Sequence, residues 1–184
     1  MKKRIVDIRS TTILGVRLKG QVAVAGDGQV TLGDMAMKQK AVKVRKFNSS
    51  KGGVVGGFAG AAADALTLFE KFEQKLDEYE GDLKRSVVEM AKDWRMDKML
   101  RHLEALLLVM DKKNSFIIAG DGNVIEPDSQ IVSIGSGGGY AQAAAMAFLK
   151  SSTFSAKKIA QEALKIASGL CIYTNDSISV IEIT

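Results

Sequence analysis

The sequence predicts an α+β domain in which two packed β-sheets are covered by pairs of helices. The length of 184 residues suits one domain with its own core. A composition of 46% hydrophobic and 26% charged residues is typical of a folded protein. The spacing of apolar residues changes along the chain between the period of a strand and that of a helix. The expected order is strands, two helices, strands, two helices and a final strand, which favours separate layers.

Strands are expected first. Apolar residues alternate in 12–19 and in 21–26, which predicts a hairpin that turns near Lys19 and Gly20. Residues 42–47 alternate in the same way. The glycine-interrupted run 53–59 suits a buried strand with close backbone approach.

Two amphipathic helices are expected next. Apolar residues follow helical spacing from Ala61 to Leu76, and 80–82 breaks the pattern. The second helical stretch then carries a long apolar stripe, which is expected to include Leu100, Leu103, Leu107 and Met110.

The second half is expected to repeat this order. Strands are predicted at 115–119, 131–134 and 178–183. Between the last two, an alanine-rich helix from Tyr140 to about Leu149 precedes a helix with Ser155 as its N-cap.

The glycine cluster 135–139 precedes the alanine-rich helix. Backbone N–H groups that converge at a helix N-terminus can bind phosphate. The cluster lacks the Gly-Lys-Ser/Thr ending of a P-loop and the spacing and downstream acid of a dinucleotide site. It is therefore a weak nucleotide signal.

The scarcity of Cys and His excludes several classes of site. With one Cys and one His, no intramolecular disulfide can form. The chain also has too few of these residues for a zinc site built on several Cys and His ligands. Any Ser-His-Asp or Cys-His catalytic arrangement must use His102, the single histidine. This residue is expected on the surface of the second helical stretch, which disfavours a conventional triad. No apolar run matches a bilayer span or a secretory signal, so we expect a cytoplasmic protein.

The net charge of +5 invites a nucleic-acid interpretation, which the charge distribution disfavours. Much of the surplus lies in residues 1–10, where four basic residues face only Asp7. Aromatic residues make up only 6%, which leaves little for base stacking. A basic nucleic-acid-binding protein is therefore the least favoured interpretation of the sequence.

One internal repeat contains an Asp-Gly pair in each copy. Residues 24–30, with Asp27, are echoed by 118–124, with Asp121. Asp-Gly between apolar alternations is a strong hairpin signal, and a plain turn is the preferred interpretation for Asp121.

Thr11 could act as a nucleophile. A threonine hydroxyl needs a base, and a free α-amine on the same residue, with a reference pKa of roughly 7.7 to 8.0, is one such base. Cleavage after Ser10 would create that amine. A nearby lysine would lower its pKa, and a carboxylate would hold the lysine. Asp27 and Lys43 are candidates, although a threonine at a strand start and a lysine on a strand usually have no catalytic role.

Eight motifs together resemble the HslV (ClpQ) family, the proteasome-like peptidases of bacteria. They occur in order at 11–16 (TTILGV), 25–33 (AGDGQVTLG), 57–60 (GFAG), 63–65 (ADA), 92–95 (KDWR), 103–106 (LEAL), 134–138 (IGSGG) and 171–175 (CIYTN). The resemblance implies an N-terminal-nucleophile hydrolase fold, a four-layer αββα sandwich. It also implies a homododecamer of two stacked six-membered rings around a closed chamber.

The resemblance assigns a role to five catalytic positions. Thr11 becomes the mature N-terminus and nucleophile, with its own α-amine as base. Lys43 falls on the active-site lysine and Asp27 on its partner carboxylate. Gly57 matches the residue whose N–H stabilises the oxyanion, and Ser136 matches a serine near the terminal amine.

A sodium site is also implied by the resemblance, with main-chain carbonyls of Ser168, Cys171 and Thr174 as ligands. Ser168 stands where the family frequently has glycine, a change that a backbone ligand tolerates. No nucleotide motif occurs in the chain, so ATP is expected to be used by a ring ATPase, HslU (ClpY), that delivers unfolded proteins. The runner-up is a non-catalytic ring scaffold of the same fold.

Residues 1–10 are interpreted as a leader, or propeptide, and 11–184 as one proteasome-β-like peptidase domain. Many family members begin with threonine directly after the initiator methionine. Self-cleavage, trimming by another protease or a misassigned start codon would each account for the ten extra residues.

Overall fold

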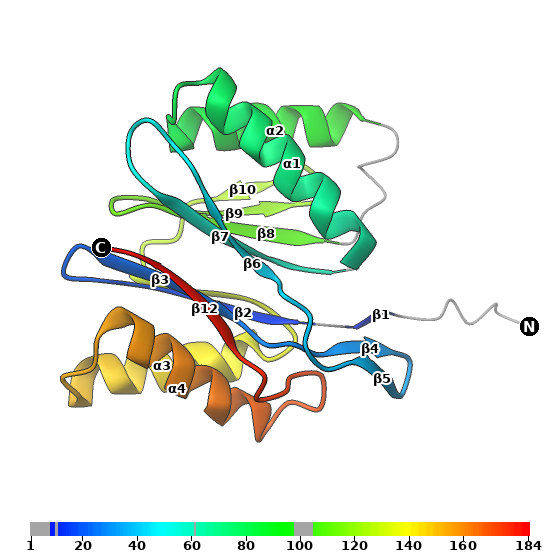
Figure 1. Cartoon of the computed structure of the whole chain (residues 1–184), viewed down its shortest axis with the longest axis vertical. Coiled ribbons are helices and arrows are strands. Elements are labelled where there is room, and N and C mark those ends of the chain that lie inside the picture. Colours follow the sequence, from blue (N-terminus) through cyan, green and yellow to red (C-terminus); the bar gives the residue numbers. More distant parts are fainter. Residues whose placement is uncertain (1–7, 10, 61, 98–104) are drawn as a thin grey trace, which may run out of the picture.

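Four layers make up the main body of the structure: a helix pair, two stacked sheets and a second helix pair (Figure 1). This computed structural model describes residues 8–9, 11–60, 62–97 and 105–184. The arrangement confirms the predicted α+β class with paired helices over two sheets.

The upper sheet in Figure 1 has five antiparallel strands and is covered by α1 (Ala62–Glu78) and α2 (Leu83–Met96). From edge to edge its strands are β10 (Val124–Ile125), β9 (Ser115–Ala119), β8 (Leu106–Met110), β7 (Val54–Ala59) and β6 (Val44–Phe47). Phe72, Trp94 and other buried side chains fill the space between these helices and the sheet.

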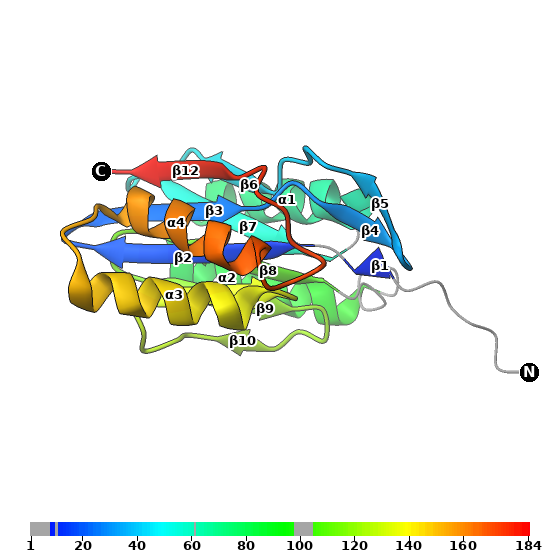
Figure 2. The same ribbon diagram turned by 90° about the horizontal axis from the view of Figure 1, so that it is seen from below.

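The lower sheet has four antiparallel strands and is covered by α3 (Gly138–Ser151) and α4 (Ala156–Ser168), which Figure 2 shows lying across it. Its strands in order are β11 (Ile131–Gly135), β2 (Thr12–Leu18), β3 (Gln21–Gly26) and β12 (Ser179–Ile183). The predicted hairpin is confirmed, because Leu18 pairs with Gln21. Ser155 caps α4 as expected, and its side chain accepts a hydrogen bond from the Lys158 N–H.

A small third sheet extends beyond one end of the two main sheets in both views (Figures 1 and 2). It consists of β1 (Ile8–Arg9), β4 (Val30–Leu32) and β5 (Met35–Lys38). The backbone of Ile8 pairs with Leu32, and that of Arg9 with Thr31. Two residues that precede Thr11 therefore add a strand to the β4–β5 hairpin.

The prediction that Leu107 and Met110 continue a helix is wrong. Both lie in β8, which is hydrogen-bonded on one side to β7 and on the other to β9. Leu107 faces the α1–α2 side of the sheet and Leu108 the space between the two sheets. Since both faces are buried, the strand is apolar throughout, and a short apolar run does not distinguish such a strand from a helix. Leu100, His102 and Leu103 lie outside the described residues.

Among the described helices, none combines the length and the apolar character needed to span a membrane.

Candidate active site

The candidate nucleophile lies at the start of a central strand. Thr11 immediately precedes β2 and is fully buried, and its carbonyl oxygen accepts a hydrogen bond from the Ser136 N–H at 3.1 Å. Its φ of 99° is unusual for a β-branched residue and costs about 1–3 kcal/mol. The chain is therefore held in a strained conformation at the residue that follows the expected cleavage site.

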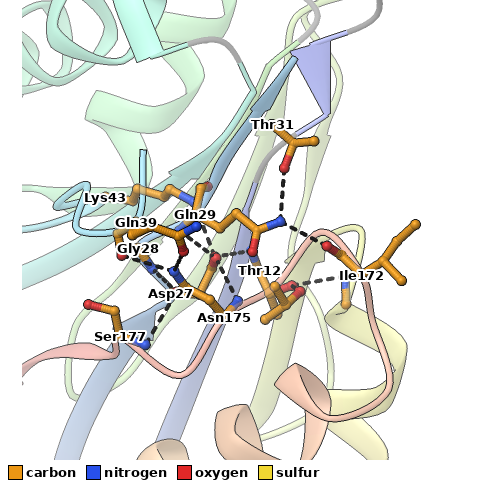
Figure 3. Close-up of polar contacts among 12 residues, drawn as sticks. Thr12, Asp27, Gly28, Gln29, Thr31, Gln39, Lys43, Ile172, Asn175 and Ser177 are labelled. Atoms are coloured by element: carbon orange, nitrogen blue, oxygen red, sulfur yellow. Dashed lines mark hydrogen bonds and ion pairs between the residues drawn. The ribbon is translucent and has the colours of Figure 1, made fainter. Parts of the chain in front are cut away.

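The carboxylate of Asp27, which directly follows β3, is the centre of the site (Figure 3). Its Oδ1 accepts hydrogen bonds from the Thr12 N–H at 2.8 Å and from the Lys43 ammonium at 3.2 Å. Its Oδ2 accepts from the N–H groups of Gln29, at 2.9 Å, and Asn175, at 3.3 Å. Four donors from separate parts of the chain thus share one carboxylate that is 0% exposed.

Lys43 is a buried cation next to the Thr11–Thr12 segment. Its side chain is 1% exposed, and the ammonium also donates to the carbonyl oxygen of Gln29. Burial lowers the pKa of this ammonium below that of an ordinary lysine, while the charge of Asp27 and their hydrogen bond oppose the shift. The structure thus excludes the solvated lysine that is usual on a strand.

Asp27 and its repeat partner Asp121 share a local turn but not an environment. Each carboxylate accepts a hydrogen bond from the N–H two residues later, that of Gln29 or of Asn123. Asp121 is exposed and lies in the turn between β9 and β10, which confirms the interpretation as a hairpin. Asp27 differs from Asp121 because it also accepts hydrogen bonds from Thr12, Lys43 and Asn175, which are distant in the sequence.

The glycine cluster lets α3 approach the Thr11–Thr12 segment closely. A Cβ on Gly135 would lie 2.0 Å from the Thr11 carbonyl oxygen, and one on Gly137 would lie 2.4 Å from the Thr12 hydroxyl. The Gly137 N–H donates to that hydroxyl at 2.9 Å, and the hydroxyls of Thr12 and Thr174 are 2.7 Å apart. Close packing against Thr11 and Thr12 therefore explains why glycine occupies these two positions, without any bound phosphate.

The remaining predicted catalytic positions lie on neighbouring elements. Gly57 is a buried residue of β7 and pairs with Val44, which follows Lys43. A Cβ on Gly57 would come within 2.7 Å of Ile13. Ser136 is exposed and contacts Thr11 through its backbone N–H.

The expected sodium ligands lie at the C-terminal end of α4 and in the turn that follows. Ser168 ends the helix, and its hydroxyl donates to the Lys165 carbonyl at 2.8 Å. The carbonyl of Cys171 accepts from the Thr174 N–H at 3.0 Å, and both residues are buried. The negative end of the helix dipole points toward this turn, which suits a hard cation bound by carbonyl oxygens. No cluster of three or more His, Cys, Asp or Glu in the described ranges could hold a metal ion.

Sequence reasoning missed two residues that complete the site. Gln29 supplies the carbonyl next to Lys43, and its side chain donates to Thr31 and to the Ile172 carbonyl. Asn175 contacts Asp27 through its N–H. Both lie inside motifs of the resemblance, 25–33 and 171–175, which was the one signal available for them.

The comparisons with known proteins cover nearly the whole chain. The sequence model of the family described as Proteasome subunit matches residues 8–183. The ATP-dependent protease subunit HslV of Treponema denticola is 53% identical over 176 residues, which are 96% of this chain and 98% of that protein. The protein of the same name from Aquifex aeolicus is 53% identical over 178 residues, 97% of this chain and 100% of that protein.

Solved structures agree with these matches. Eukaryotic HslV from Trypanosoma brucei superposes with a TM-score of 0.85 and 44% identity, over 93% of this chain and 98% of that one. The Thiobacillus denitrificans protein BPH, solved in complex with epoxomicin, superposes with a TM-score of 0.69. At 17% identity, over 94% of this chain and 97% of that one, it shows a shared fold alone.

Proposed function

The chain belongs to the proteasome subunit family, and we propose that it is the peptidase subunit of an ATP-dependent protease of the HslV type. It is a threonine endopeptidase that hydrolyses peptide bonds of unfolded proteins delivered by a ring ATPase, HslU. The observation that carries the proposal is the shared acceptor: Asp27 Oδ1 binds both the Lys43 ammonium and the Thr12 N–H. Through Asp27, this contact holds the cation next to Thr12, the residue that directly follows the nucleophile.

The proposed reaction uses the free α-amine of Thr11 as its base. The Thr11 hydroxyl attacks the carbonyl carbon of the substrate while the α-amine takes its proton. The C–N bond breaks, the departing amine receives the proton, and water then hydrolyses the ester. Lys43 lowers the pKa of the α-amine by charge repulsion. The backbone N–H of Gly57 stabilises the oxyanion, and Ser136 lies near the terminal amine.

We further propose that the chain removes its own leader. The Thr11 hydroxyl attacks the Ser10 carbonyl carbon, the Ser10–Thr11 bond breaks to free the α-amine, and water hydrolyses the resulting ester. Two observations support this: the pairing of β1 with β4 anchors the leader just before the bond, and the φ of Thr11 is strained. Cleavage removes the covalent constraint on that φ.

For Thr11→Ala we expect an assembled protein that keeps its leader and loses about six orders of magnitude in peptidase kcat. The wild-type protein should begin at Thr11. Intact-mass measurement and hydrolysis of a small fluorogenic peptide check both expectations, and Thr12→Ser is a control that keeps the hydroxyl at the neighbouring position. Leader loss in Thr11→Ala would assign processing to another protease. Full activity of protein that begins at Met1 would contradict the mechanism. Wild-type protein that keeps its leader and shows no activity would favour the scaffold alternative.

Replacing Lys43 with alanine should lower kcat by about 100- to 1,000-fold, because the charge that tunes the α-amine is lost. Lys43→Arg should restore little, since the guanidinium fork places its charge elsewhere. Asp27→Asn should show a milder loss. Steady-state kinetics on leader-free protein measures these effects, and Lys46→Ala, which removes an exposed lysine of β6, is the matched control. Equal rates for Lys43→Ala and Lys46→Ala would exclude a catalytic Lys43.

The oligomeric state and the need for ATP are tested separately from the catalytic residues. We propose a dodecamer of two stacked hexameric rings, because a chamber confines a peptidase of low intrinsic specificity. Light scattering after size-exclusion chromatography should give the mass of 12 chains, an expectation that comes from the resemblance. Small peptides should be cleaved slowly by this protein alone, and folded proteins only with HslU and ATP. A monomer that digests folded proteins without nucleotide would overturn the proposal.

A sodium ion at the turn after α4 is also proposed, with the carbonyls of Ser168, Cys171 and Thr174 as ligands. Binding to the folded state alone raises stability, so Tm should be a few degrees higher in sodium chloride than in choline chloride of equal ionic strength. Differential scanning calorimetry measures the shift, with Thr11→Ala as a variant that leaves these carbonyls intact. Identical Tm values in the two salts would rule out a stabilising cation.

A further inference from the structure

We infer that Asn175 is a positioning residue that holds the Asp27–Lys43 pair in place, an inference that rests on the proposed function. Its backbone N–H donates to Asp27 Oδ2 at 3.3 Å. Its side-chain Oδ1 accepts from the Gly28 N–H at 3.0 Å and from the Ser177 N–H at 3.2 Å. These contacts join the turn after α4 to the turn that carries Asp27 (Figure 3).

The amide nitrogen of Asn175 reaches a third segment. Nδ2 donates to the backbone oxygen of Gln39 at 2.9 Å and to its side-chain Oε1 at 2.8 Å. Gln39 lies four residues before Lys43, and the Ala41 N–H between them donates to the Gly28 carbonyl at 2.9 Å. A single half-buried side chain thus connects the residue that follows Asp27 with the segment that leads into Lys43.

Asn175 holds together two segments that lie in direct backbone contact. A Cβ on Gly28 would lie 2.4 Å from the Gln39 carbonyl oxygen, so the two segments already touch at the backbone. Both groups of the amide are used, Oδ1 as acceptor and Nδ2 as donor, and alanine supplies neither. In Asn175→Ala the two segments are therefore freer to separate, which lengthens the contact between Asp27 and Lys43.

Kinetics of the leader-free, assembled protein test the inference. Asn175→Ala should lower kcat by about tenfold, as expected when hydrogen bonds of this kind are lost, with KM nearly unchanged. A weaker contact with Asp27 also lowers the pKa of Lys43 further. The alkaline limb of the pH profile of kcat, where Lys43 loses its proton, should therefore move to lower pH. A role in folding alone would leave this limb in place.

Asn175→Asp shifts the profile in the opposite direction. The carboxylate keeps an acceptor for Gly28 but loses the donor to Gln39. The negative charge that it adds close to Asp27 and Lys43 outweighs this loss and raises the pKa of Lys43. The alkaline limb should therefore move to higher pH. This variant also serves if Asn175→Ala does not assemble, because its side chain has nearly the size of the original one.

Asn123→Ala is the matched control. Asn123 follows the other Asp-Gly pair, and its amide donates to Asp121 in an exposed hairpin. The control should keep the wild-type kcat and pH profile. Wild-type kinetics in Asn175→Ala, or failure of both Asn175 variants to assemble, would overturn the inference. Neither result would affect the proposed function, which fails instead if Thr11→Ala is active.

Discussion

The candidate site depends on one buried carboxylate whose charge must be compensated. Removing an ionised group from water costs several kcal/mol unless hydrogen bonds and an opposite charge replace the lost solvation. Asp27 obtains them from the N–H groups of Thr12, Gln29 and Asn175 and from the ammonium of Lys43. These donors come from β2, the turn after β3, the turn after α4 and Lys43, which directly precedes β6. The carboxylate is therefore satisfied only when the lower sheet, β6 and the turn after α4 are all in place.

Tight backbone contacts keep this arrangement in register. Gly135 and Gly137 allow the start of α3 to lie against Thr11 and Thr12, and the Thr12 hydroxyl links that helix to Thr174. Side chains at these glycines would collide with backbone or hydroxyl oxygens that cannot move independently of the strand. The glycine cluster, a weak nucleotide signal in the sequence, thus serves close backbone packing, because only residues without a Cβ fit at Gly135 and Gly137. The same contacts bring the turn after α4 to the nucleophile segment through the hydroxyls of Thr12 and Thr174.

Local sequence patterns predicted most elements, and they failed where burial erased the pattern. The alternation in 12–26 and the cap at Ser155 are local signals, and both elements occur as expected. In β8 the signal was lost, because Leu107 and Leu108 face two different hydrophobic cores and both must be apolar. A strand of this kind is specified by its neighbours β7 and β9, which a window of a few residues does not contain. The short strands of the third sheet have no periodicity of their own.

The two Asp-Gly copies show why the site itself was harder to predict than the fold. Their local geometry is the same, since each aspartate accepts from the N–H two residues later. What separates Asp27 from Asp121 is supplied by Lys43, 16 positions away, and by Asn175, 148 positions away. Sequence spacing alone left Asp27 and Lys43 as two candidates among many, and only the resemblance selected them. Asn175 stayed unnoticed because an asparagine in a loop near the C-terminus is indistinguishable from an ordinary turn residue until the fold brings Gly28 and Gln39 to either side of it.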